Sequence, residues 1–234
     1  MIKKKFSLFN SFIIRFINLL SIFFDLIFGK PTPVIRKSFR IGIDSNSRYT
    51  PAIMEMKTLL TLDADLSRRF RLDSSRTTLK KIAAFLAHSG DSWFWAAGLG
   101  LLWLFTQEDW HRNSALMLIG VVVLAILVLA IKFTIRRQRP EGEWGAIYRN
   151  KDPHSFPSGH AARAFMLAIL ALTLGPAWFG LLVIIWAPLV SLARVSMGVH
   201  YLSDVVAGMV VGVLAGIILV WISPVLISLL PFIF

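Results

Sequence analysis

The sequence predicts an all-α protein, an integral membrane helical bundle of five or six spans with amphipathic N-terminal helices. Of the 234 residues, 56% are hydrophobic, and the mean hydropathy of +0.68 is too high for an ordinary soluble domain. Long apolar runs alternate with polar, basic connections. The chain has no cysteine, which excludes disulfides and thiolate metal sites. We therefore expect a multi-pass protein of the cell membrane.

The net charge of +12 indicates an anionic partner. Because the basic residues alternate with membrane segments, anionic lipid headgroups or a phosphorylated substrate fit this charge better than nucleic acid. No zinc finger, RNA-binding or helix-turn-helix signature is present. The expected partners are thus the membrane and a lipid phosphate substrate, with no nucleic acid. The sequence leaves the oligomeric state open.

The N-terminal part, residues 1–61, is expected to form an amphipathic or first hydrophobic helix and a basic linker, ahead of a membrane-embedded domain at 62–234. In residues 6–28 the polar side chains fall on one helical stripe. The segment is therefore either an interfacial helix or a span whose polar stripe faces its neighbours. Residues 54–70 and 77–88 are predicted as amphipathic helices on the membrane surface.

Next come the apolar segments that form the bundle. Asp91 is the possible N-cap of the first one, and a further apolar tail runs past Pro224 after the last. Several are shorter than the ~20 residues that span a bilayer, so polar flanks must extend them. Their connections define two faces, and the loop 136–156 and the junction 194–204 belong to the same one. The five segments are residues 92–106, 113–135, 160–174, 177–193 and 205–222.

This shared face holds nearly all the reactive groups. Lys132 and Arg139 are two helical turns apart, so they are expected to project from one side of a helix end that Pro140 terminates. Taken alone, they fit cations that snorkel to a membrane interface.

A Pro-Ser-Gly-His tetrapeptide stands at the start of the segment 160–174. Ser158 can cap the helix, and Gly159 allows a ligand close to the backbone. The open N–H groups of a helix start form an anion site, which would place His160 beside the anion. By itself the tetrapeptide also fits a plain cap with an incidental histidine.

The third group of residues lies in the junction 194–204. His200 and Asp204 are four residues apart, so Asp204 can accept a hydrogen bond from one ring nitrogen of His200. The other nitrogen is then left as a nucleophile or base. Arg194 adds a cation at the end of the preceding helix.

Together these groups predict phosphoryl chemistry. Ionisable residues at membrane-helix ends are costly unless they are used. Three cations with helix N–H donors can bind a phosphoryl group, and two histidines can supply a nucleophile and an acid.

Three blocks, "KFTIRRQRP", "PSGH" and "ARVSMGVHYLSD", resemble the signatures of the type-2 phosphatidic acid phosphatase family, Lys-x6-Arg-Pro, Pro-Ser-Gly-His and Ser-Arg-x5-His-x3-Asp. The resemblance covers about residues 62–222. Within the family, "LDADLSRRF" and "HSFPSGHAARA" are similar to the polyisoprenoid diphosphate phosphatase branch. Ala193 stands where the family usually has Ser, so that hydroxyl contact to phosphate is not carried over. Residues 1–61 have no counterpart.

The resemblance implies a metal-independent membrane phosphatase that works through a phosphohistidine and needs no cofactor. His200 would be the nucleophile, Asp204 would orient it, and His160 would protonate the leaving group. The sequence also shows no second carboxylate near the site from which to build a magnesium site. The residues that would hold the phosphoryl oxygens are Lys132, Arg139, Ser158, Gly159 and Arg194.

A site at the bilayer rim suits a lipid substrate, and prenyl diphosphate, phosphatidate and phosphatidylglycerol phosphate are candidates. The branch resemblance favours prenyl diphosphates. One alternative is a non-catalytic scaffold that binds anionic lipids, which would need the cations but not the His200–Asp204 pair. A lipid transporter would need polar groups at the middle of the spans or broken helices, and the segments 113–131 and 205–221 show neither. The site faces the cytoplasm if residues 6–28 do not cross the membrane, and faces outward if they do.

Overall fold

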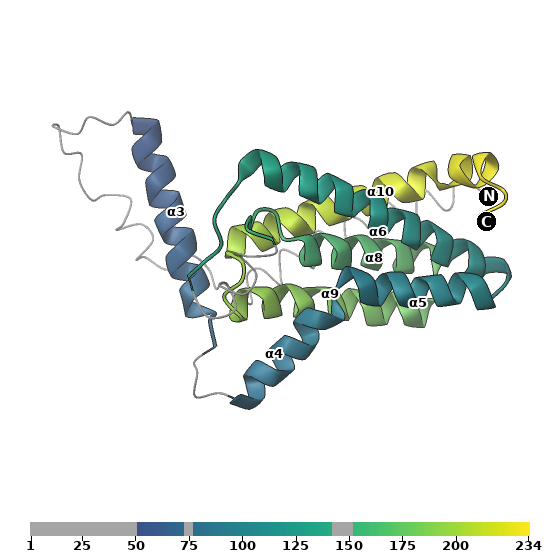
Figure 1. The fold of residues 1–234 in the computed structure, drawn as a ribbon, viewed down its shortest axis with the longest axis horizontal. Coiled ribbons are helices and arrows are strands. Elements are labelled where there is room, and N and C mark those ends of the chain that lie inside the picture. The colour runs from purple at the N-terminus through teal and green to yellow at the C-terminus, as the bar shows by residue number, and fades with distance from the viewer. Residues whose placement is uncertain (1–50, 73–76, 142–151) are drawn as a thin grey trace. The chain divides into compact units, whose positions relative to one another are not determined.

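The structure is a computed structural model that describes residues 51–72, 77–141 and 152–234. All regular elements in these ranges are helices, and the all-α prediction is confirmed. Residues 6–28 lie outside the described ranges, and the domain boundary expected after residue 61 stays a prediction. The helices are α3 (Pro51–Arg69), α4 (Thr77–Ser89), α5 (Ser92–Phe105), α6 (Glu108–Ile135), α8 (Gly159–Leu174), α9 (Ala177–Ser196) and α10 (Leu202–Leu229) (Figure 1).

The central helix of the bundle is α8. It packs against α6, α9 and α10, while α5 packs against α6 and α4 against α9 (Figure 1). Every residue from Ala161 to Ala171 is buried, and Arg163 is the one charged residue among them. A helix that is apolar on all sides is stable when other helices surround it. The first turn of α8, which carries the Pro-Ser-Gly-His block, is therefore held from several directions.

Glycines let α10 approach α8 closely. Gly208, Gly212 and Gly216 recur every fourth residue along the contacting side of α10. A Cβ atom at Gly212 would lie 2.1 Å from the carbonyl oxygen of Ala162. One at Gly208 would lie 2.4 Å from the carbonyl oxygen of Ser158. Such stripes of small residues are common where membrane helices touch. Here the stripe brings the start of α8 against the start of α10, where the backbone N–H of Ser158 donates to the carbonyl of Asp204 at 2.9 Å.

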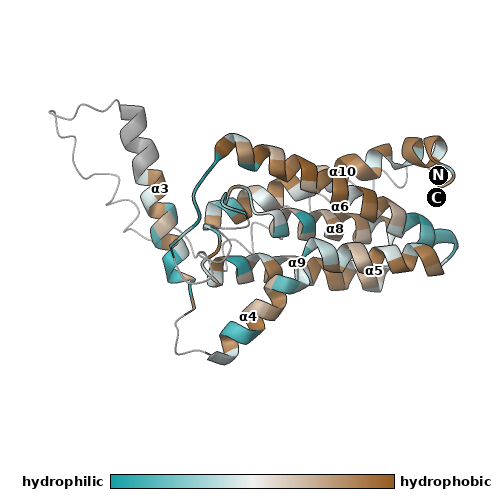
Figure 2. Cartoon of the chain, viewed as in Figure 1, coloured by the Kyte–Doolittle hydropathy of each residue, from teal (hydrophilic) through white to brown (hydrophobic). Residues whose placement is uncertain are grey.

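The surface of the bundle suits a membrane. Among the described residues, α6, α9 and α10 are long and apolar enough to span a bilayer, and α5 and α8 are shorter apolar helices. Figure 2 shows these helices as mostly hydrophobic, whereas the connection after α6 and parts of α3 and α4 are hydrophilic. The five helices correspond to the five apolar segments that the sequence predicts. The protein is therefore a membrane protein.

One helix end differs from the prediction. Pro140 does not terminate α6, because Arg136 already takes a left-handed conformation with φ 53° and ends the helix at Ile135. The last apolar segment and part of the tail past Pro224 form one helix, α10, which continues to Leu229. Proline removes one backbone hydrogen bond, and the hydroxyl of Ser223 donates to the carbonyl of Val220 at 2.8 Å in its place. Hydroxyl side chains can satisfy such carbonyls and so allow proline inside membrane helices.

Candidate active site

The predicted site residues gather around one cavity of about 310 Å³. One part of its wall is charged, and the other is an apolar side of α6. Ser158 and Asp204 are fully buried and do not line the cavity. Among the predicted residues, those that line it are Lys132, Arg139, Gly159, His160, Arg194 and His200.

Three buried cations reach the cavity from three segments. Lys132 comes from the last turn of α6, Arg194 from the last turn of α9, and Arg139 from the extended connection after α6. Their exposed fractions are 5%, 0% and 3%, respectively. Arg139 donates to the carbonyl of Val199 at 2.8 Å, which confirms that the loop 136–156 and the junction 194–204 lie on one face. Buried cations of this density are suited to an anion with more than one charge.

The sequence predicts no second carboxylate at the site, and this expectation is wrong. Asp152 forms an ion pair with Lys132 and lies 2.8 Å from Nη2 of Arg139. A bridge between Gln138 and His154 folds its segment back along Arg139. Burial alone would raise the pKa of Asp152, but its hydrogen bond to Lys132 and the charges of Lys132 and Arg139 outweigh burial and lower the pKa. Asp152 is therefore ionised and partly neutralises the cations.

His200 presents Nε2 to this cluster. Arg139 can only donate, so its contact of 3.2 Å with Nε2 means that Nε2 carries the lone pair and Nδ1 the proton. The ring is 1% exposed. Burial lowers the pKa of His200 well below its ordinary value, and the charges of Arg139, Arg194 and Lys132 lower it further. His200 is thus a neutral imidazole with its nucleophilic nitrogen directed at the cations.

Asp204 lies beside His200, but the predicted hydrogen bond is longer than expected. Oδ2 of Asp204 is 3.6 Å from Nδ1 of His200, beyond ordinary hydrogen-bond distance. The same oxygen instead accepts from the backbone N–H of Tyr201 at 2.9 Å, as part of a capping box at the start of α10. Catalytic hydrogen bonds are often long without substrate and shorten in the complex.

Arg137 and Asp63 support Asp204, and motif reasoning did not identify either of them. Arg137 donates to Oδ1 of Asp204 at 2.8 Å and to Oδ2 of Asp63, on α3, at 2.6 Å. Its guanidinium also lies 4.0 Å from the centroid of the Tyr201 ring. Asp63 further accepts from the backbone N–H of Ser203 at 3.0 Å. In the sequence, Asp63 stands two residues from Asp65 in "LDADLSRRF", and nothing in this spacing shows which of the two carboxylates meets Arg137.

His160 stands in the first turn of α8, as predicted. Ser158 is the N-cap residue, and its hydroxyl accepts from the backbone N–H of Ala161 at 3.5 Å. Asp91 is the N-cap residue of α5 by position, but its side chain makes no capping hydrogen bond. Its carboxylate instead contacts Nε2 of His160 at 2.7 Å. The two histidines of the site are thus each beside a carboxylate.

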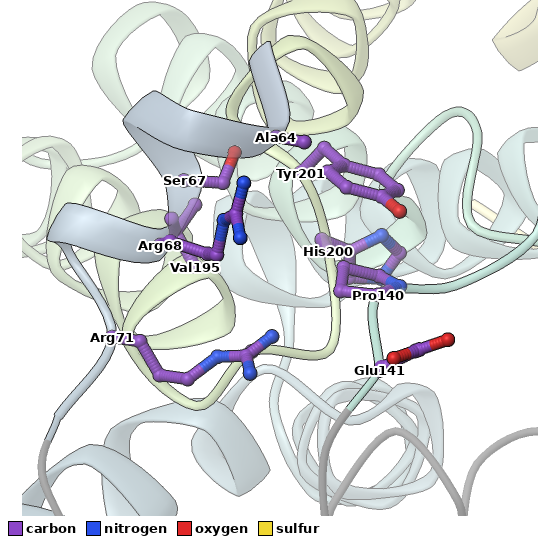
Figure 3. A pocket seen from close by; sticks show the side chains of 10 residues that line it. Ala64, Ser67, Arg68, Arg71, Pro140, Glu141, Val195, His200 and Tyr201 are labelled. Atoms are coloured by element: carbon purple, nitrogen blue, oxygen red, sulfur yellow. The ribbon is translucent and has the colours of Figure 1, made fainter. Parts of the chain in front are cut away.

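His200 also borders a second cavity, of about 300 Å³. Figure 3 shows Arg68 and Arg71 on one side of it and His200, Tyr201 and Glu141 on the other. Arg71 lies against Gly198, whose φ is +68° and where a Cβ atom would be 2.6 Å from Nε of Arg71. His200 therefore lies between a cavity with an apolar wall and a cavity with basic and acidic side chains.

Among the described residues, no group of three or more His, Cys, Asp or Glu side chains is placed to hold a metal ion. The acidic residues of the site are instead paired with cations or histidines. Metal independence stays a prediction.

Comparison with known proteins shows sequence relatives of this chain. The family model of the PAP2 superfamily matches residues 113–227. An undecaprenyl-diphosphatase of Sulfolobus acidocaldarius is 31% identical over 138 residues, which are 58% of this chain and 66% of that protein. A decaprenylphosphoryl-5-phosphoribose phosphatase of Mycobacterium tuberculosis is 34% identical over 140 residues, which are 57% of this chain and 74% of that protein.

A solved structure has a similar fold. The crystal structure of a transmembrane PAP2 type phosphatidylglycerolphosphate phosphatase from Bacillus subtilis matches with a TM-score of 0.57, over 75% of this chain and 88% of that one. The two sequences are 23% identical, so the likeness concerns the fold alone.

Proposed function

Since this chain belongs to the PAP2 superfamily, we propose that it is a multi-pass lipid phosphatase of the cell membrane, which removes phosphate from a lipid phosphate or diphosphate without a metal ion. One relative is named an undecaprenyl-diphosphatase, and another is named for decaprenylphosphoryl-5-phosphoribose. A phosphorylated polyprenyl lipid is therefore the favoured substrate class, with a polyprenyl diphosphate first because of the former name. Phosphatidate and phosphatidylglycerol phosphate are the other candidates, the latter because of the structural neighbour.

The observation that carries the proposal is the cavity shared by two histidines, three cations and an apolar side of α6. Val121, Leu124 and Val128 of α6 line the same cavity as Lys132, so an acyl or prenyl chain can lie along the helix that supplies a phosphate ligand. A site that combines an apolar wall with a few placed charges is suited to an amphiphile.

The geometry supports an attack by Nε2 of His200 on phosphorus. Lys132, Arg139 and Arg194 would contact the phosphoryl oxygens and stabilise the charge of the transition state, together with the N–H groups at the start of α8. Asp204 would accept a hydrogen bond from Nδ1–H of His200 and so stabilise the ring as it gains charge. His160 would protonate the leaving oxygen, and water would then hydrolyse the phosphohistidine.

Asp152 has a consequence for substrate entry. Its carboxylate occupies the position between Lys132 and Arg139 that a phosphoryl oxygen would take. Binding of the phosphoryl group would therefore require that Asp152 move or share these two cations.

The test is phosphate release by the purified protein in detergent, with a polyprenyl diphosphate, phosphatidate and phosphatidylglycerol phosphate as substrates. We expect release from at least one of them, in excess chelator, and none from His200→Ala. Arg112→Ala is the control, because Arg112 pairs with Asp109 at the opposite end of α6. Binding to anionic vesicles without phosphate release from any substrate would instead support the non-catalytic scaffold.

A further inference from the structure

The turn between α4 and α5 lies against the first turn of α8. Asp91 is in this turn, with Oδ1 2.7 Å from Nε2 of His160 and Oδ2 3.1 Å from Nδ1 of His88. The side chains of Asp91 and His160 are 20% and 16% exposed. Burial alone would raise the pKa of Asp91, but the hydrogen bonds to His160 and His88 outweigh burial and lower the pKa. Asp91 is thus an ionised carboxylate in contact with the second histidine of the site.

A second side chain of α8 holds the residues on both sides of Asp91. Arg163, one turn after His160, donates to the carbonyl of Gly90 and to the hydroxyl of Ser92. Gly90 fits closely, because a Cβ atom there would lie 2.8 Å from Cγ1 of Val190 and 3.2 Å from Cδ2 of His160. The carboxylate of Asp91 is therefore placed by contacts to its neighbours in the chain, and not by its bond to His160 alone.

Asp91 lies outside the three sequence blocks and outside residues 113–227, the range that the family model matches. Its contact uses Nε2 of His160, so Nδ1 is the ring nitrogen left for a substrate in the cavity that His160 lines. We propose that Asp91 is a positioning residue for His160. It accepts a hydrogen bond from Nε2–H, directs Nδ1 at the leaving oxygen, and stabilises the imidazolium. This inference rests on the proposed phosphatase function.

The proton balance follows from this arrangement. When Nε2 of His200 attacks, the bond from nitrogen to phosphorus forms and the bond from phosphorus to the lipid oxygen breaks. The lipid oxygen takes the Nδ1 proton of His160, and Asp91 stays ionised. Water then attacks phosphorus, its proton returns to Nδ1, and the bond between nitrogen and phosphorus breaks. An alkoxide needs the first proton, whereas 4-nitrophenolate is a weak base and leaves without it.

The experiment compares two leaving groups in detergent. With phosphatidate, Asp91→Asn should lower kcat/KM roughly 10²-fold, a loss typical of impaired general acid catalysis. With 4-nitrophenyl phosphate, kcat/KM should fall less than about three-fold, because kcat/KM reports the departure of the leaving group, and this leaving group needs no acid. Asp91→Glu, which keeps the carboxylate, should recover part of the phosphatidate activity. In a His160→Ala background, Asp91→Asn should lower the remaining rate by less than about two-fold, because the two residues act as one unit.

Asp109→Asn is the matched control, since Asp109 also stands at a helix start but is exposed and pairs with Arg112. Equal losses of Asp91→Asn with both substrates would show a merely structural role. A further loss of roughly 10²-fold when Asp91→Asn is added to His160→Ala would also overturn the inference. So would an Asp91→Asn protein with wild-type activity on phosphatidate. A wild-type protein that releases phosphate from none of the three lipids, the polyprenyl diphosphate included, would instead overturn the proposed function. Wild-type activity on any of these lipids keeps the two failures apart.

Discussion

At the scale of single residues, the site is a cluster of buried cations around a neutral histidine. Lys132, Arg139 and Arg194 would repel one another in the absence of an anion, and Asp152 offsets part of that repulsion. The cost of burying such charges is several kcal/mol per ion, so the rest of the fold must stabilise the cluster. A bound phosphoryl group supplies the charge that the cluster otherwise lacks.

Arg194→Ala should lower kcat by ~10²–10³, because one preorganised contact to the transition state is lost. Arg112→Ala, at the other end of α6, should leave kcat within about two-fold, since exposed ion pairs contribute little. Arg194→Lys should recover activity only in part, because an ammonium cannot make a bidentate contact. Steady-state kinetics on proteins with matched thermal unfolding would measure this. If Arg194→Ala and Arg112→Ala lowered kcat equally, the basic residues would act by attracting anionic lipid in general and not as specific phosphate ligands.

The acidic limb of kcat/KM should lie below pH ~6.5, the ordinary value for histidine. Burial lowers the pKa of His200, and so do Arg139, Arg194 and Lys132, whereas Asp152 acts in the opposite direction. A lowered pKa keeps His200 neutral, and therefore nucleophilic, as the pH falls through 6.5. Lys132→Met should move the limb toward higher pH. The measurement is kcat/KM against pH for both proteins with the same substrate, so that any titration of the substrate affects both profiles equally. If the acidic limb of Lys132→Met lay at the same pH as that of the wild type, the titration of His200 would not be its cause.

Motif spacing predicted a set of eight site residues, and the structure gathers six of them around one cavity. It did not predict Asp91, Asp152, Arg137 or Asp63. Each of these residues pairs with a side chain that is distant in the sequence. No periodicity or spacing in the sequence reveals which of these side chains meet. The expected hydrogen bond from His200 to Asp204 followed from the geometry of an ideal helix. In the structure the capping box at Tyr201 holds Asp204 slightly away.

At the scale of helices, the contact between α8 and α10 fixes the positions of two sequence blocks. Gly212→Ala should destabilise the fold by about 1–3 kcal/mol, because a methyl group would meet the carbonyl of Ala162 at 2.1 Å and separate the helices. The activity should fall as well, since Ser158 and Asp204 lie at the same contact. Gly98→Ala is the control, because a Cβ atom there meets nothing within 4 Å. Thermal unfolding in detergent would measure both, and equal unfolding temperatures would contradict the close packing.

Apolar runs predicted the five bundle helices well, because burial in lipid or protein requires long uninterrupted stretches of apolar residues. Helix ends were less predictable. The end of α6 depends on the left-handed backbone conformation of Arg136, which an arginine in the sequence does not predict. The continuation of α10 through Pro224 depends on the hydroxyl of Ser223, which takes over one carbonyl. Local compensation of this kind becomes visible only in the folded helix.

At the scale of the whole molecule, the site lies at one end of α6 and Asp109 at the other. A helix of 28 residues is about 42 Å long, enough to cross a bilayer. Since the chain has no cysteine, Arg68→Cys and Asp109→Cys give single labelling sites at exposed positions. In intact cells a membrane-impermeant maleimide should label one variant and not the other. The labelled position identifies the outer face and thereby the side on which substrate reaches His200. Labelling of both would mean that α6 does not cross.

The proposed mechanism depends on transfer of the phosphoryl group to His200. This step can be tested by rapid acid-free quenching of the protein with a substrate labelled in the transferred phosphate, followed by mapping of the labelled residue by mass spectrometry. We expect phosphohistidine at His200 in the wild type and more of it when release is slowed by His160→Ala. The label should be absent in His200→Ala and unaffected in Arg112→Ala. Phosphate on another residue, or turnover by His200→Ala without a phosphoenzyme, would rule out His200 as the acceptor.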